Sequence, residues 1–109
     1  MVVKRKPTAG NGSALASKRA ASCQDVIRRV LCKAREIEAV FLLTDDANIV
    51  HVFSVVREFQ AAFYDKLLKK EQTIAKVLPE IVFEFHLRAH QGREPALAVP
   101  FDAELVYCR

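Results

Sequence analysis

Two histidines, His51 and His86, lie in apolar stretches whose residues alternate as they do in β-strands. Glu84 and Arg88 stand two residues to either side of His86, so the three side chains share one strand face. An imidazole pair beside a carboxylate can bind a transition-metal ion or shuttle protons. The sequence fixes no third ligand, so we predict a surface or interface pair, with a metal site or an enzyme centred on His51 and His86 as an alternative.

The remaining polar clusters give weaker chemical signals. Asp45 and Asp46 could hold a divalent cation or act as acid and base, but such residues are typical of tight turns, which we expect here. His86 and His90 would lie roughly 13 Å apart on a strand, too far to share a ligand. Because there is no P-loop, nucleophile elbow or HExxH motif, the sequence favours a non-enzymatic protein without a cofactor.

The charge distribution is uneven along the chain. Residues 1–35 contain nine basic side chains and one acidic side chain, whereas the remainder contains eight basic and twelve acidic ones. We expect a disordered basic arm at residues 1–12 and a single domain at residues 13–109. One interpretation of this pattern is binding of nucleic acid or of an acidic protein. The alternative is that the basic residues form a tail that is only solvated. The candidate residues for such contacts are Lys4, Arg5, Lys6, Arg28, Arg29, Arg88 and Arg93.

Residues 37–56 predict a β-hairpin, because two β-branched and aromatic runs flank a polar break at residues 44–48. An even-numbered loop would determine which side chains share a face. One face would then carry Ile37, Ala39, Phe41, Leu43, Val50, Val52 and Val56. The opposite face would carry Val40, Leu42, Ile49, His51, Phe53 and Val55. Both faces are apolar, so each needs a cover.

The two predicted helices that flank the hairpin would cover one of these faces. A helix with a capping-box-like start at Ser22 should run to about Arg35, and a second should follow the hairpin and end near Leu78, before Pro79. The expected buried residues of the second helix include Phe59 and Val77. A third strand over residues 80–88 should turn its odd-numbered residues toward the helices. Residues 101–107 predict a short edge strand, or a helical turn starting at Pro100.

These elements predict an α+β two-layer sandwich in the order α-β-β-α-β, with a fourth strand. Two helices would cover one face of a three- to four-stranded, mainly antiparallel sheet, in which the third strand could run parallel to the second. The strand, the Asp-Asp turn, "HVFSVV", the helix and "LPEIVFEFHLRAHQGR" resemble small uncharacterised bacterial proteins over residues 36–93. That resemblance implies no catalytic residue.

We therefore expect a small cytoplasmic interaction module that forms a homodimer through its uncovered sheet face. No apolar run approaches the ~20 residues of a membrane span, and the cysteine spacing favours reduced thiols. The interface candidates are Val40, Leu42, Ile49, His51, Phe53, Val55, Val82 and His86. In the competing arrangement, residues 95–109 fold over that face and complete a monomer.

Overall fold

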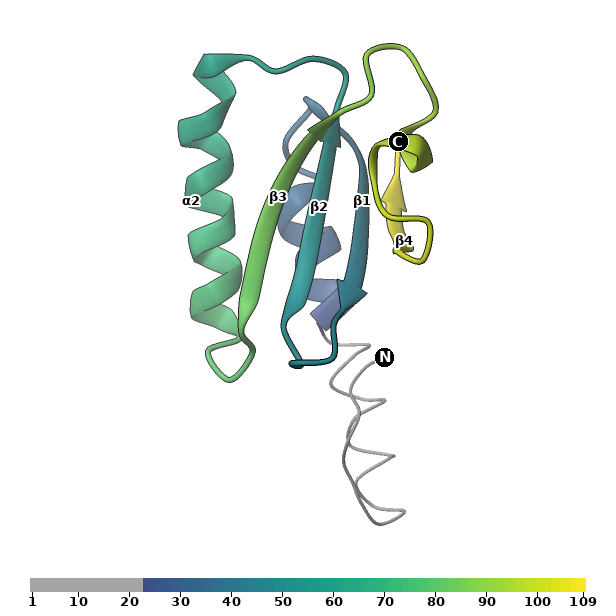
Figure 1. Ribbon diagram of the computed structural model, residues 1–109. Helices are drawn as coiled ribbons and strands as arrows, with labels where there is room; N and C mark the ends of the chain where they lie inside the picture. Colours follow the sequence, from purple (N-terminus) through teal and green to yellow (C-terminus); the bar gives the residue numbers. More distant parts are fainter. Residues whose placement is uncertain (1–22) are drawn as a thin grey trace.

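The computed structural model describes residues 23–109 of the chain (Figure 1). A helix covers residues 23–31 within this range, and we call it the N-terminal helix. The elements that follow are β1 (Ile37–Thr44), β2 (Val50–Val56), α2 (Ala61–Val77), β3 (Phe83–Ala89), the short 3₁₀ helix η1 (Pro95–Ala98) and β4 (Glu104–Cys108). The expected arm at residues 1–12 lies outside the described residues. No helix in residues 23–109 has the length and apolar character needed to cross a membrane.

The four strands form one sheet in the order β3-β2-β1-β4. β1 pairs antiparallel with both β2 and β4, whereas β2 and β3 are parallel. The α+β class is confirmed, but the prediction of a mainly antiparallel sheet is wrong, because the sheet is mixed. The physical reason is the long connection through α2, which returns the chain to the starting end of β2 before β3 begins. The chain order is therefore α-β-β-α-β-β, with β4 as an edge strand.

The hairpin register differs from the expected one. Thr44 pairs with Val50 and Phe41 pairs with Phe53, so the loop between the strands has an odd number of residues. Asn48 adopts a positive φ of 66° within this loop, which an asparagine tolerates. One loop residue more or fewer turns every side chain of a strand to the other face. The expected grouping of side chains was therefore wrong, and Phe41 shares its face with His51 and Phe53.

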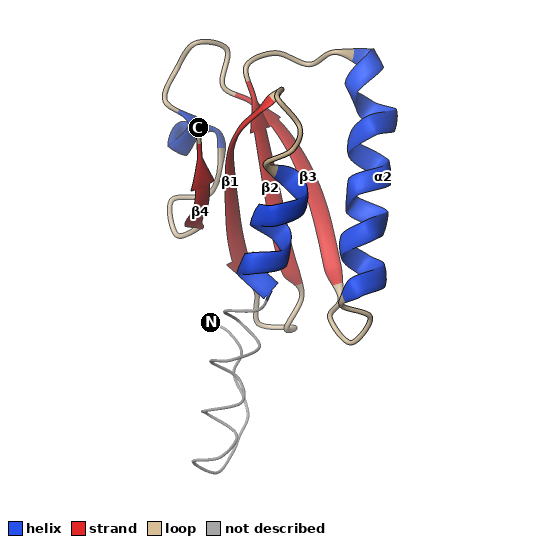
Figure 2. Ribbon diagram, turned by 180° about the vertical axis from the view of Figure 1, so that it is seen from behind, coloured by secondary structure: helices blue, strands red, loops and turns tan. Residues whose placement is uncertain are grey.

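The N-terminal helix and α2 lie on the same side of the sheet, which we call the helix face (Figure 2). Ile27 and Leu31 of the first helix are fully buried there, at a spacing of four residues, and each contributes roughly 1.5–3 kcal/mol by its burial. Val40 and Leu42 are 0% and 8% exposed in the same core, so the prediction that they lie on the uncovered face was wrong. The partly buried strand residues of this core include Val50, Phe83, Phe85, Leu87 and Ala89.

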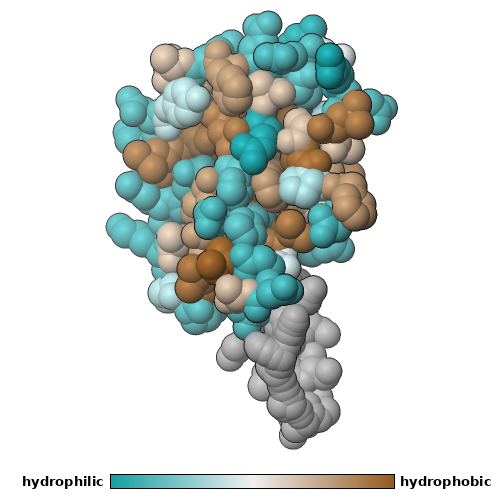
Figure 3. Space-filling view, in the orientation of Figure 1, coloured by the Kyte–Doolittle hydropathy of each residue, from teal (hydrophilic) through white to brown (hydrophobic). Residues whose placement is uncertain are grey.

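The opposite side of the sheet, here called the second face, has its own smaller core. It consists of Ala39, Phe41, Phe53 and Val55, with Ala98, Val99 and Ala103 packed against them. Part of the segment after β3 therefore folds over this face, whereas β4 extends the sheet at its edge. The competing arrangement expected all of residues 95–109 to cover this face. Figure 3 shows this side of the molecule, on which apolar and polar residues are interspersed.

α2 buries a narrow stripe made by Phe63, Leu67 and Ile74. Its backbone hydrogen bonding ends at Leu78, directly before Pro79, as the sequence predicted. The prediction that Phe59 and Val77 belong to this stripe was wrong, because both are more than half exposed. Phe59 precedes the helix, and Val77 is its last residue, where the side chain remains accessible to solvent.

Candidate metal centre

Parallel pairing of β2 and β3 brings the two strand histidines together on the second face. His51 lies opposite Glu84, and Phe53 lies opposite His86. The Nδ1 atom of His51 is 2.9 Å from the Nε2 atom of His86, and the two rings stack with centroids 5.2 Å apart. The sequence placed these residues on one face, and the register makes them direct neighbours.

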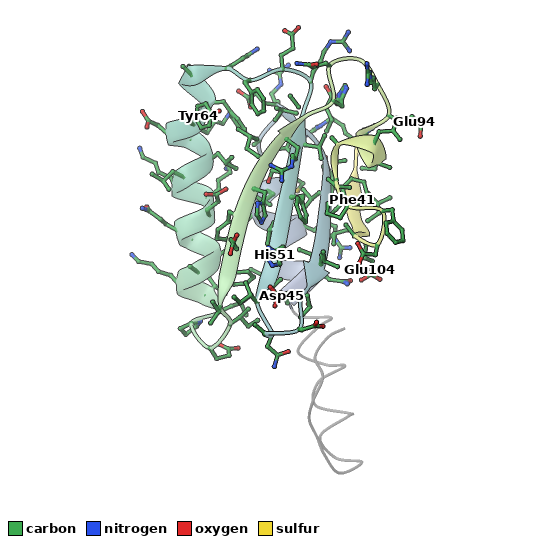
Figure 4. All side chains as sticks on the ribbon, viewed as in Figure 1. Phe41, Asp45, His51, Tyr64, Glu94 and Glu104 are labelled. Carbon is green, nitrogen blue, oxygen red and sulfur yellow. The ribbon has the colours of Figure 1, made fainter. Side chains whose placement is uncertain are left out.

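Asp45, in the hairpin loop, lies next to His51 (Figure 4). Its Oδ1 accepts backbone N–H bonds from Ala47 at 2.8 Å and from Ile49 at 3.0 Å, which is the expected turn chemistry. Its Oδ2 lies 2.8 Å from Nε2 of His51. The hydrogen bond with His51, followed by that from Ile49, lowers the pKa of Asp45, so this carboxylate stays ionised.

The Asp45 contact determines the tautomer of His51. An ionised carboxylate only accepts hydrogen bonds, so Nε2 of His51 carries a proton and donates it to Asp45. In the neutral imidazole, Nδ1 then has a free lone pair directed at Nε2 of His86. A single proton, on His86, completes that bond.

Glu84 supplies a third possible metal-ligand atom beside the two imidazoles. Its Oε1 lies 3.7 Å from Nε2 of His86. Among the described residues, His51, Glu84 and His86 each offer one ligand atom, and all three atoms lie within 4.8 Å of one another. Tetrahedral zinc with Zn–N and Zn–O bonds near 2.0–2.1 Å separates its ligand atoms by roughly 3.4 Å. The His51–His86 and His86–Glu84 separations are each within about half an ångström of that value.

The surroundings of His86 favour its neutral form. Partial burial, then the positive charge of Arg88 and that of His51 when its ring is protonated, lower the pKa of His86, while the carboxylate of Glu84 opposes this shift. The Phe53 ring stacks on His86 with centroids 4.6 Å apart, and the Arg88 guanidinium lies 5.6 Å from the centroid of Phe53. A neutral imidazole is the form that binds metals.

The other predicted interface candidates are dispersed. Phe53 and Val55 are buried beside the C-terminal segment, Ile49 lies in the hairpin loop, and Val82 is 62% exposed just before β3. These residues do not form one continuous uncovered patch.

The predicted anion-binding residues are also not brought together. Arg28 and Arg29 are exposed and both form ion pairs with Asp25, at 3.2 Å and 2.8 Å. Arg88 lies on the second face, and Arg93 is exposed in the loop after β3. The remaining candidates, Lys4, Arg5 and Lys6, lie outside the described residues.

Two further groups stand apart from the centre. His90 is buried, its Nε2 lies 2.7 Å from Oε1 of Glu38, and its Nδ1 accepts the N–H of Gly92. Sequence reasoning missed this contact, because Glu38 and His90 are 52 residues apart and no local pattern relates them. Burial, with a smaller effect from Glu80, raises the pKa of the Cys23 thiol to about 11, so that thiol stays protonated.

The fold and the cluster together define a small α+β domain with a histidine–carboxylate centre on its sheet. No family model matches the chain, and no curated protein matches it either.

Proposed function

We propose that this protein binds one zinc-class divalent metal ion through Nδ1 of His51, Nε2 of His86 and the carboxylate of Glu84. The observation that carries this proposal is the convergence of the three ligand atoms within 4.8 Å. Imidazole nitrogens and a carboxylate oxygen are ligands that zinc accepts in proteins. The ion would replace the proton between the two imidazoles.

Asp45 supports the assignment from outside the ligand set. Metal-binding histidines usually donate their second N–H to a carboxylate, which orients the ring and raises its basicity. Oδ2 of Asp45 accepts such a bond from Nε2 of His51, while Oδ1 is held by the turn. The His51 ring is thus oriented with its free lone pair toward the other ligands.

Three protein ligands leave a fourth tetrahedral position for water or a substrate, an arrangement typical of catalytic rather than structural zinc. A bound ion would supply Lewis acidity at that position. The centre lies on partly exposed side chains of the sheet, with Glu84 exposed, so that position would be reachable from solvent.

Calorimetric titration with zinc tests the proposal. The wild-type chain should bind one ion, and His51→Gln and His86→Gln should each weaken binding by at least about 10-fold, because each removes a ligand. His90→Gln is the matched control, since His90 lies outside the cluster, and circular dichroism verifies that each variant folds. Equal binding by His86→Gln and wild type would refute the proposal.

Self-association is a second candidate function, on a surface other than the one first predicted. The observation that favours it is the exposure of Phe101, which is 99% accessible, together with Leu97 at 74% and Leu105 at 54%. All three belong to the C-terminal segment. Apolar side chains exposed to this extent are typical of contact surfaces when they lie close together.

A further inference from the structure

A basic groove separates the two helices on the helix face. It has a volume of about 570 Å³ and is lined by residues of the N-terminal helix and α2 (Figure 2). Val30 and Ala62 are its small apolar lining residues. Its polar lining residues are Lys33, Asp65, Lys66, Lys69, Lys70 and Thr73.

The positive charge of this groove is local. Residues 23–109 contain twelve basic and thirteen acidic side chains, a formal net charge of −1, yet four lysines and one aspartate line the groove. Lys66 forms an ion pair with Glu36 at 3.1 Å. Lys33, Lys69 and Lys70 form no ion pair within the described part of the chain.

The arrangement of the lysines leaves a repulsion that an anion would relieve. Lys66 is three residues from Lys69 and four from Lys70 on α2, a spacing at which like charges destabilise a helix. Lys33 adds a further ammonium group from the opposite wall. A ligand with several separated negative charges could contact both walls at once.

We propose that this groove binds the phosphodiester backbone of nucleic acid. Lysine ammonium groups act as point charges that suit successive phosphates, whereas arginine forks suit bidentate carboxylates, and no arginine lines the groove. No aromatic side chain lines it either, and contacts to the phosphate backbone carry no sequence information directly, so binding is independent of sequence. This site is separate from the metal centre, which lies on the other face of the sheet.

Fluorescence anisotropy of a labelled oligo-uridine, measured at several salt concentrations, tests the proposal. Each phosphate contact contributes about 0.7 to the slope of log affinity against log salt for a single strand. Replacing Lys33, Lys69 and Lys70 by Gln in one variant should therefore reduce the slope by about 2 and weaken binding at 50 mM salt by at least about 10-fold. Lys76→Gln is the matched control, because Lys76 lies in the last turn of α2 but does not line the groove.

Three results would overturn the proposal. The first is no binding of oligo-uridine by the full chain at low salt. The second is an unchanged slope in the triple variant, which would assign binding to basic residues outside the groove. The third is equal affinity for polyglutamate, which would show that the groove selects charge rather than phosphate. A triple variant that loses the slope while retaining wild-type circular dichroism and zinc binding supports it.

Discussion

The Asp45 carboxylate and the His51 imidazole are joined by a 2.8 Å hydrogen bond that links the hairpin loop to its second strand. One oxygen of Asp45 stabilises the loop, and the other holds His51 in the tautomer whose Nδ1 lone pair is free. A residue that turn propensity explains completely thus also orients His51, one of the proposed metal ligands. The same carboxylate stabilises the loop and fixes the orientation of this ring.

Asp45→Asn tests whether the carboxylate determines the tautomer of His51. The amide oxygen can still accept the turn bonds, but its NH₂ group would donate to His51 and favour the wrong tautomer, with a proton on Nδ1. We expect zinc affinity to fall by about 10-fold or more, as for other losses of a supporting carboxylate. Calorimetric titration measures this change. Asp46→Asn, at the exposed neighbouring position, is the control, and an equal loss in that variant would contradict the account.

Glu71 predicts a dependence of stability on pH. Its partial burial raises its pKa from 4.5 to about 7, and no ion pair in residues 23–109 includes it. The folded state therefore binds this proton more tightly than the unfolded state, so the contribution is fully present below pH 4.5 and is lost as the pH rises through about 7. Urea midpoints at pH 5 and pH 8 should show that Glu71→Gln gains stability relative to wild type at the higher pH. An identical difference between the two proteins at both pH values would contradict this.

The contact between His90 and Glu38 should stabilise the fold rather than bind a metal. Because Nδ1 of His90 accepts from Gly92, its Nε2–H must donate to Glu38. Glu38→Ala would leave this buried donor without its partner, at a cost of about 1–3 kcal/mol. Denaturant unfolding measures the loss, and exposed Glu58→Ala should change stability by less than about 0.5 kcal/mol. Similar values for the two variants would show that the buried contact contributes little.

Phe101 tests the second candidate function. Its side chain is 99% exposed, so Phe101→Ser should leave the unfolding free energy of a single chain nearly unchanged. If the C-terminal surface self-associates, the same change should raise the dimer dissociation constant by about 10-fold or more, because burying a Phe contributes roughly 1.5–3 kcal/mol. Sedimentation velocity over a range of concentrations measures this. Phe59→Ser is the control, and a wild-type chain that stays monomeric at every concentration would exclude the surface as an interface.

Much of the fold could be predicted from local patterns. The second helix with its end at Pro79 and the alternation of the third strand follow from periodicity and from proline chemistry. The patterns left the last segment open between an edge strand and a helical turn, and the structure has an edge strand. The register of the hairpin could not be predicted, because the sequence Asp-Asp-Ala-Asn fits turns of more than one length. That single uncertainty moved Val40 and Leu42 to the wrong face.

The cluster of His51, Glu84 and His86 could be predicted in part from the same sequence patterns. The alternation of β3 placed Glu84 and His86 on the face of His51, but only the parallel register sets His51 opposite Glu84. The contact from Asp45 depends on the geometry of the loop, which residue types alone do not specify. The His90–Glu38 contact joins residues far apart in sequence, and Glu38 lies at a register shift between β1 and β2 that residue types alone do not specify.

X-ray absorption of the zinc-loaded chain identifies the atoms that bind the ion. We expect two imidazole nitrogens and two oxygens at about 2.0–2.1 Å, from His51, His86, Glu84 and one solvent ligand. His86→Gln should leave at most one imidazole in the spectrum. A sulfur ligand at about 2.3 Å, which would come from a cysteine, or a wild-type spectrum with fewer than two imidazoles, would contradict the assignment.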